Sequence, residues 1–308
     1  MPRSPRRGVE NEGEAWVVET ARALFPLETS GVGIGDDAAV LPLGNVVTMD
    51  TMVEGVHWDA RLSPADVGWK LAAVNVSDIG AMGGRPRWAT LSLTLPRPLD
   101  RDWVGAFYGG LAEAFAAYGV ALVGGDTTRG PARVAALTVG GTVSRPVLRS
   151  GARPGDELWV TGELGRSAQA FLRSECSAEA LAWFRRPRPP VAFGAALAEA
   201  GLPTAMMDLS DGLAADLHRL CAASGCGALV EPYALPTTGT IAEAVAFGED
   251  FELLFTAAAG EDVAICSLAE KFETRVSKVG IVRGSPVVSL IGLEWPRSLF
   301  SHFERESS

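Results

Sequence analysis

The sequence predicts an α/β protein of two domains, each built on a mixed α+β sheet. Strand-like and helix-like segments alternate along the chain, a pattern typical of sheets covered by helices. The stretch 145–160 is rich in Pro, Gly and Arg and separates two such halves, as interdomain connections commonly do. With 308 residues, of which 47% are apolar, the chain is long enough to bury a core in each half.

The first half is expected to form one sheet with helices packed on it. Pro64 begins a long apolar helix, and the pair Gly83–Gly84 ends it, because paired glycines favour a helix stop. We expect helices at 14–25, 64–84 and 100–119, and strands at 45–53, 87–96, 120–125 and 133–143.

The second half is expected to repeat this α/β organisation. Leu213, Leu217 and Leu220 recur at helical spacing and indicate an amphipathic helix after the strand 204–210. We expect further helices at 165–174, 178–185 and 191–200, and further strands at 227–231, 251–257, 277–283 and 286–291.

Charge and cysteine usage exclude several classes of protein. Twenty-seven Lys and Arg against 37 Asp and Glu leave a net charge of −10, which argues against nucleic acid as a partner. An uninterrupted apolar run of about 18 residues is absent, so we expect no membrane partner. The four cysteines are irregularly spaced without a CxxC pair, which favours reduced thiols in a cytoplasmic protein.

Aspartates occur repeatedly in apolar surroundings. The segment "GVGIGDDAAVL" (31–41) sets Asp36 beside Asp37, and adjacent buried carboxylates repel each other unless water or a cation is present. Asp50, Asp126 and Asp208 each end an apolar strand, where ligands of open α/β sheets bind. The remaining members of this set are Asp78, one helical turn after Asn75, and Asp211.

Each aspartate alone also has a purely structural interpretation. Ser210 and Asp211 precede a helix and could cap it, and Asp126 in "GGDTT" could belong to a turn. The whole set is better explained by a hard cation, since Mg²⁺ is held by carboxylates together with substrate phosphates. Lysine occurs only at positions 70, 271 and 278, outside any phosphate-binding GxxxxGK[ST] loop. The pattern therefore predicts a metal-dependent nucleotide-phosphate site.

Motif blocks in order over nearly the whole chain resemble the thiamine-monophosphate kinase family, in the superfamily of aminoimidazole-ribonucleotide synthetase. The blocks are "GIGDDAAV", "TMDTMVEGVHW", "AVNVSDIGAMGGRPRWATLSLTLP", "GGDTTRGP", "RSGARPGDELWVTGELG", "MDLSDGLAADL" and "GEDFELLFT". The resemblance implies a two-domain protomer whose N-terminal sheet forms a barrel in a homodimer. It also implies transfer of the γ-phosphoryl group of ATP to thiamine phosphate, giving thiamine diphosphate.

The same resemblance implies domain limits and residue roles. A flexible tail would span 1–13, an ATP- and Mg²⁺-binding dimerisation domain 14–146, and a C-terminal α/β domain 147–308. The implied metal ligands are Asp36, Thr48, Met49, Asp50, Asp78, Asp126, Asp208 and Asp211. Met49 stands where relatives often carry Thr, so its main-chain carbonyl would be the ligand, and Asp37 is not assigned as a direct ligand.

The same resemblance implies one group of residues that binds ATP and another that binds thiamine phosphate. The ATP contacts are Tyr108, Gly125, Asp126, Arg149 and Ser210, and the thiamine phosphate contacts are His57, Glu249 and Phe300. The acceptor phosphate is already largely dianionic at neutral pH, so no general base is expected and the transfer would be direct and in-line.

Two alternative functions remain beside the kinase, one from an enzyme of the same superfamily and one from a protein that is not an enzyme. The first alternative is another ATP-dependent synthetase of the same superfamily. A selenophosphate synthetase would carry Cys and Lys near its first glycine loop, whereas the first lysine of this chain is Lys70 and the first cysteine is Cys176. A catalytically silent nucleotide-binding regulator with this fold is the other. Carboxylates at the metal positions favour the kinase.

Overall fold

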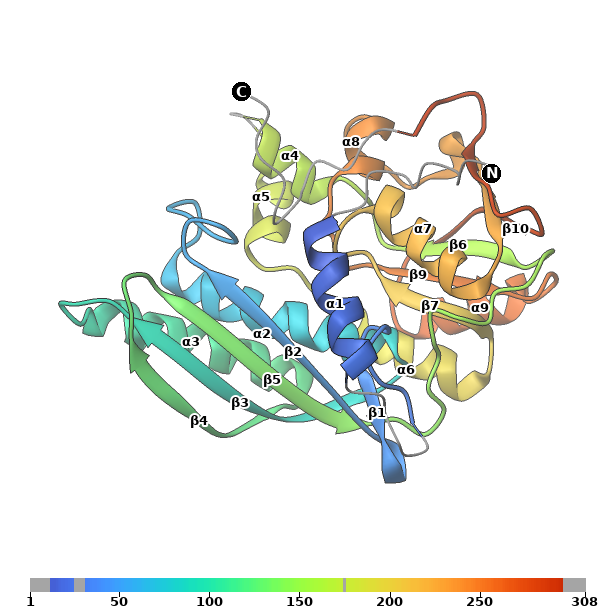
Figure 1. Ribbon diagram of the computed structural model, residues 1–308. Helices are drawn as coiled ribbons and strands as arrows, with labels where there is room; N and C mark the ends of the chain where they lie inside the picture. The colour runs from blue at the N-terminus through green and yellow to red at the C-terminus, as the bar shows by residue number, and fades with distance from the viewer. Residues whose placement is uncertain (1–11, 25–30, 174–175, 296–308) are drawn as a thin grey trace, which may run out of the picture.

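The computed structural model describes residues 12–24, 31–173 and 176–295, which fold around two mixed sheets (Figure 1). The first sheet has the strand order β1-β2-β5-β3-β4. Its strands are β1 (Ala39–Leu41), β2 (Asn45–Val53), β3 (Arg85–Leu95), β4 (Ala121–Arg129) and β5 (Val134–Thr142). The mixed α/β class expected from the sequence is confirmed, because parallel and antiparallel pairs occur in both sheets.

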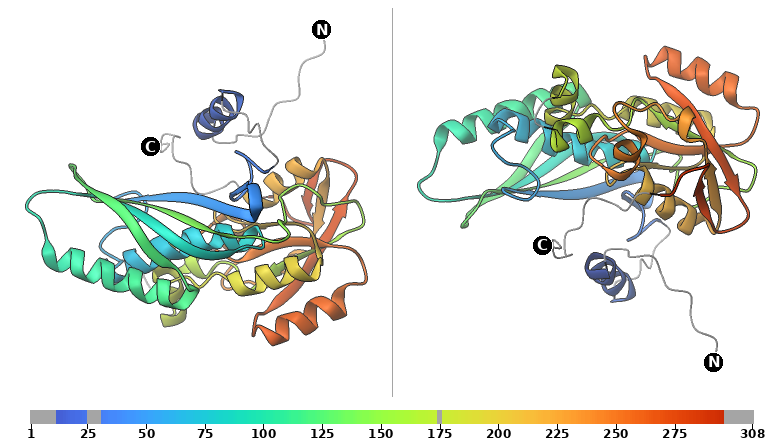
Figure 2. Two further views of the ribbon diagram at one scale, coloured as in Figure 1. Left: turned by 90° about the horizontal axis from the view of Figure 1, so that it is seen from below. Right: turned by 90° about the horizontal axis from the view of Figure 1, so that it is seen from above.

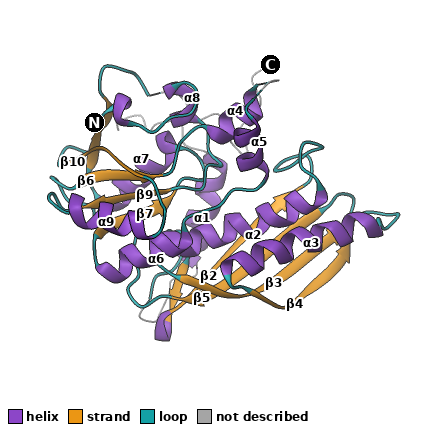
Figure 3. Ribbon diagram, turned by 180° about the vertical axis from the view of Figure 1, so that it is seen from behind, coloured by secondary structure: helices purple, strands orange, loops and turns teal. Residues whose placement is uncertain are grey.

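Two long helices, α2 (Pro64–Ala81) and α3 (Arg101–Tyr118), cover one face of this sheet (Figure 3). Ser63 and Asp66 form a capping box at the start of α2, with Pro64 in the first turn. The two helices approach closely at Gly110, where a Cβ would lie only 1.8 Å from the Ala65 carbonyl oxygen. The absence of a side chain at Gly110 therefore sets how deeply α3 packs on α2.

The opposite face of the first sheet is largely open, with α1 (Glu12–Leu24) lying over it (Figure 2). All of β4 is exposed, and β4 is an edge strand that pairs with β3 alone. Four large apolar side chains contribute to this open surface: Met49, Trp88, Leu122 and Val123. Exposed apolar patches and unpaired edge strands are features that usually mark an interaction surface.

The second sheet has the strand order β11-β8-β10-β6-β9-β7. Its strands are β6 (Glu157–Thr161), β7 (Pro203–Asp208), β8 (Gly227–Val230), β9 (Leu253–Ala257), β10 (Val276–Arg283) and β11 (Val288–Leu290). Helix α7 (Leu213–Ser224) packs on one face, and α6 (Val191–Ala200) with α9 (Asp262–Lys271) packs on the other. Strand positions such as Met206 and Met207 consequently face different cores.

Helix α2 connects the two halves of the molecule. It contacts α3 and β2 of the first half and α6 and β7 of the second. Short helices complete the described fold: α4 (Arg166–Leu172), α5 (Ala178–Arg185), α8 (Ile241–Ala246) and two 3₁₀ turns, η1 (Pro42–Gly44) and η2 (Pro232–Ala234). None of the helices in the described ranges is both long and apolar enough to cross a membrane.

Candidate functional site

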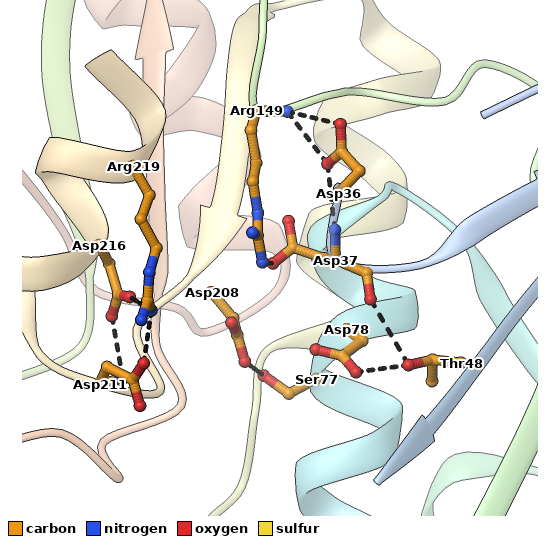
Figure 4. A network of polar contacts seen from close by, with 10 residues as sticks. All are labelled: Asp36, Asp37, Thr48, Ser77, Asp78, Arg149, Asp208, Asp211, Asp216 and Arg219. Atoms are coloured by element: carbon orange, nitrogen blue, oxygen red, sulfur yellow. Dashed lines mark hydrogen bonds and ion pairs between the residues drawn. The ribbon is translucent and has the colours of Figure 1, made fainter. Parts of the chain in front are cut away.

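Carboxylates from both halves of the chain meet around the C-terminal half of α2 (Figure 4). Asp37 comes from the loop before β1, Asp78 from α2 and Asp208 from the end of β7. One oxygen atom of each lies within 4.8 Å of one oxygen atom of each of the other two. The acidic cluster, as we call these three residues, therefore joins segments that are far apart in the sequence.

Helix α2 orients the neighbouring strands through side chains on its last turns. Thr48 on β2 donates a 2.7 Å hydrogen bond to Asp78 Oδ2, and the Asp50 amide donates a 3.0 Å bond to Asn75 Oδ1. Ser77 donates a 2.7 Å bond to Asp208 Oδ2. These contacts explain why Asp50, which lies within β2, and Asp208, which ends β7, converge on α2, whereas Asp126 lies within β4 and does not.

The adjacent residues Asp36 and Asp37 have different environments. Asp36 accepts hydrogen bonds of 3.1 and 3.2 Å from the Arg149 amide. Asp37 is buried, and its Oδ1 accepts a 2.7 Å bond from the Arg149 guanidinium. Its Oδ2 is buried with no hydrogen-bond partner in the described part of the chain. Asp37, which sequence reasoning left out of the ligand set, is therefore the member of the pair that lies in the acidic cluster.

Burial and mutual repulsion disfavour negative charge throughout this site. Burial, with the nearby Asp37 charge, raises the pKa of Asp36 to about 6 and that of Asp208 to about 7. Burial together with Asp50 and Asp208 raises the pKa of Asp78 well above its usual range. Burial and the Asp211 charge also raise the pKa of Asp50. Ionising all these carboxylates at once requires a compensating positive charge.

Two arginines supply part of that charge. Arg149 lies against Asp37, and Arg219 on α7 lies 2.5 Å from Asp211 and 2.8 Å from the buried Asp216. The Asp211 amide also donates a 3.0 Å hydrogen bond to Asp216 Oδ2. Two side chains of the following helix α7 thus hold Asp211 beside the acidic cluster, and Ser210 precedes Asp211 in the chain (Figure 4). Neither Arg219 nor Asp216 was singled out from the sequence, because a charged helix face usually indicates only a solvated surface.

A cavity of about 320 Å³ adjoins Asp36 and Asp37. Its wall includes the glycine-rich loop, Val18 of α1, Thr48 of β2 and the Arg149 side chain. Apolar and cationic groups therefore border an open space next to buried carboxylates, an arrangement suited to an anionic ligand that is bound together with cations.

His57 and Glu249, the two described residues expected at the acceptor, lie on loops, His57 after β2 and Glu249 before β9. His57 Nδ1 accepts a 3.0 Å hydrogen bond from the Val53 amide, which anchors its loop to the end of β2. Glu249 accepts a 3.0 Å bond from Lys70, and its amide donates a 2.8 Å bond to the Ser210 carbonyl. The loop of Glu249 is therefore fixed next to Asp211.

The structure does not bring every expected residue to the acidic cluster. Asp126 and Gly125 lie on β4, three strands from Asp50 in the first sheet, or roughly 14 Å at the usual strand spacing. Tyr108 lies exposed on α3. Met49, expected to ligate through its main-chain carbonyl, is an exposed residue, and strand alternation directs its side chain away from Thr48 and Asp50. Phe300 lies outside the described residues.

The donor chemistry of the acidic cluster fits a hard divalent cation. Its ligand atoms are all carboxylate oxygens, without His or Cys, and Mg²⁺ and Ca²⁺ prefer such oxygens. The buried, partnerless Asp37 Oδ2 and the raised pKa of each member identify a position where a cation would be stabilising.

Comparison with known proteins gives the same family over both halves. Residues 35–144 match the N-terminal domain of the family described as AIR synthase related protein, and residues 153–292 match its C-terminal domain. A thiamine-monophosphate kinase of Salmonella typhimurium is 41% identical over 249 residues, which are 73% of this chain and 75% of that protein. A thiamine-monophosphate kinase of Synechococcus elongatus is 34% identical and covers 92% of this chain and 93% of its own length.

Solved structures agree with the sequence relatives. The thiamine-monophosphate kinase of Stenotrophomonas maltophilia is 35% identical, with a TM-score of 0.76 over 90% of this chain and 96% of its own. A structure described as AaThiL complexed with AMPPCP and TMP is 29% identical, with a TM-score of 0.83 over 97% of this chain and 100% of its own.

Proposed function

Because the chain belongs to the thiamine-monophosphate kinases of the AIR synthase related family, we propose that it phosphorylates thiamine phosphate with ATP. The γ-phosphoryl group passes to the phosphate of the acceptor, so that ADP and thiamine diphosphate are formed. The structural relative complexed with AMPPCP, an ATP analogue, and TMP supports both substrates.

The observation that carries this proposal is the acidic cluster of Asp37, Asp78 and Asp208 beside a cavity bordered by Arg149. A silent regulator would not need three clustered carboxylates, two of them buried, at their energetic cost. The decisive assay incubates the purified protein with MgATP and thiamine phosphate and measures thiamine diphosphate. Hydrolysis of ATP without that product would contradict the proposal, and nucleotide binding without turnover would favour the regulator.

The proposed mechanism is direct in-line transfer without a phosphoenzyme. The acceptor oxygen is already deprotonated at neutral pH, so catalysis depends on positioning and on charge rather than on a general base. Arg149 is proposed to contact ATP, with Ser210, Gly125, Asp126 and Tyr108 as further contacts, and His57, Glu249 and Phe300 are proposed at thiamine phosphate. Labelled phosphate trapped on the protein by acid quench after a single turnover would contradict this mechanism.

We propose Mg²⁺ as the resident cation, held by Asp37, Asp78 and Asp208. Bound Mg²⁺ would neutralise phosphate charge on the two polyanionic substrates. Thr48 and Ser77 keep two of these carboxylates oriented through their hydroxyl groups. The remaining proposed ligands are Asp36, Asp50, Asp126, Asp211 and the carbonyl of Met49.

We also propose a homodimer in which a second copy covers the open face and β4 edge of the first sheet. The exposed Met49, Trp88, Leu122 and Val123 provide apolar area, and β4 offers unpaired backbone groups. Since Asp126 lies on this surface and far from its own acidic cluster, it would complete the site of the partner copy. This arrangement predicts that the monomer alone has an incomplete site.

Residues 14–146 and 147–308 are the proposed domains, because the first sheet lies within 39–142 and the second within 157–290. A cytoplasmic location is proposed from the use of ATP and from the four cysteines, which form no disulfide bond.

A further inference from the structure

Lys70 is a buried cation that the proposed chemistry does not use. It is one of only three lysines in the chain and lies on α2 with its side chain 1% exposed. Its Nζ lies 3.0 Å from Glu249 Oε2 and 4.1 Å from the centre of the Phe184 ring. The side chain thus reaches from the first half of the molecule to a loop of the second half.

Stability alone gives a weak reason for a lysine at this position. Removing a lysine from water is costly, and an ion pair with a partner that is itself 30% exposed regains little of that cost. A methionine could fill the same space against Phe184 without desolvating a charge. The positive charge is therefore better explained by what it does to Glu249.

The rest of the Glu249 residue is already fixed. Its backbone has a φ of +64°, a left-handed conformation that costs energy for a residue with a side chain. Its amide donates a 2.8 Å hydrogen bond to the Ser210 carbonyl, and its carbonyl accepts a 2.7 Å bond from the Ser167 hydroxyl. Only the side-chain torsions remain free, and Lys70 removes that freedom.

Lys70 holds one end of the Glu249 carboxylate and leaves the other accessible. Among the described residues, Lys70 is the only side chain that hydrogen-bonds this carboxylate, and it does so through Oε2. The 30% exposure of the Glu249 side chain leaves room for a ligand to approach Oε1. An oriented carboxylate oxygen suits an amino group or a ring cation, and thiamine phosphate carries both.

We propose that Lys70 is a positioning residue for the phosphoryl acceptor, acting by holding Glu249 in the orientation that accepts the aminopyrimidine–thiazolium part of thiamine phosphate. This inference rests on the proposed function. Lys70 touches neither substrate, so its loss weakens acceptor binding without weakening ATP binding. The effect passes entirely through the Glu249 carboxylate.

The test measures initial rates for Lys70→Met, Glu249→Gln and the double variant, with both substrates varied. Lys70→Met should raise KM for thiamine phosphate about ten- to hundredfold, the range of one charged hydrogen bond, with kcat and the KM for ATP within about twofold. The double variant should match Glu249→Gln alone, because Lys70 has nothing left to orient. Arg85→Met is the matched control: it removes the cation of an exposed 2.9 Å pair with Glu199 and should leave both KM values unchanged.

Several outcomes contradict the assignment. Equal rises in both KM values, a fall in kcat alone, or additive effects in the double variant would each show that Lys70 does not act through Glu249. If Lys70→Met does not fold, the double variant, which retains no charge from this pair, still decides when it is compared with Glu249→Gln. A wild-type protein that forms no thiamine diphosphate contradicts the proposed function. An active wild-type protein whose Lys70→Met variant changes the KM values for ATP and thiamine phosphate equally contradicts only the role of Lys70.

Discussion

Asp208 links the acidic cluster to the stability of the whole protein. Burial raises its pKa to about 7 from an ordinary 3.8, so the folded chain holds a proton here that the unfolded chain has released. The stabilisation is complete below about pH 4 and is lost as the pH rises through 7. Without divalent metal, the free energy of unfolding should therefore fall from pH 5 to pH 8.

Asp208→Asn should remove much of this pH dependence and stabilise the metal-free protein at pH 8 by on the order of 2 kcal/mol. Denaturant unfolding at both pH values measures the effect. Asp102→Asn, at an exposed position on α3, is the control and should leave the pH dependence unchanged. A variant at position 208 with the wild-type pH dependence would show that this carboxylate titrates normally.

Ser224 positions the Arg149 segment from the end of α7. Its hydroxyl accepts 3.1 Å hydrogen bonds from the amides of Gly151 and Ala152 and donates a 3.0 Å bond to the Arg149 carbonyl. Ser224→Ala should raise the KM for ATP by about three- to tenfold through misplacement of Arg149, with little change in the KM for thiamine phosphate. Steady-state kinetics measure both values, and an equal effect on both would contradict this role.

For individual residues, the sequence predicts the type of site, a group of carboxylates that binds a metal ion, but does not identify every residue that belongs to it. The position of Asp208 could be predicted because it ends the apolar strand β7, whereas Asp50 lies within β2 and not at the strand end expected from the sequence. The sequence assigned Asp36 and not Asp37 to the metal ligands, whereas the structure places Asp37 in the acidic cluster. The loop has no periodicity that separates the two, and the deciding contact comes from Arg149, over one hundred residues away. Lys70 was visible as a rare lysine, but its burial depends on the packing of α5 and on the Glu249 loop.

The packing of α2 against α3 depends on the missing side chain of Gly110. A Cβ there would lie 1.8 Å from the backbone oxygen of Ala65, which cannot move without shifting α2. Gly110→Ala should therefore lower the free energy of unfolding by about 1–3 kcal/mol. The neighbouring Gly109→Ala meets open space and should instead stabilise the helix by up to about 1 kcal/mol. Equilibrium unfolding of the pair measures the contrast, and two similar values would contradict the tight helix contact.

Element limits follow from local signals where those signals are strong. The cap at Ser63 with Pro64 and the left-handed Gly119 define the start of α2 and the end of α3. Strand β4 extends to Arg129, beyond the expected 120–125, because its pairing with β3 continues to Leu95. The exposure of every β4 residue could not be predicted, since an apolar strand resembles a buried one in sequence.

For the whole molecule, the position of Asp126 decides whether one protomer alone can form a complete active site. In the proposed dimer, the strands of a second copy would bring its Asp126 to the first copy's acidic cluster, and symmetry would make two equivalent sites. Asp50→Ala and Asp126→Ala should each abolish turnover and leave folding intact. Circular dichroism and thermal unfolding check the fold of each variant.

Mixing the two inactive variants tests the shared site directly. After subunit exchange, half of the dimers carry one variant of each kind, and one of their two sites combines an intact Asp50 with an intact Asp126. Activity should therefore return to roughly a quarter of the wild-type rate, since only one site in four is complete. Each variant alone, taken through the same exchange procedure, is the control and should stay inactive. A mixture that remains inactive, although sedimentation shows exchanged dimers, would mean that each protomer completes its own site and that Asp126 does not act across the interface.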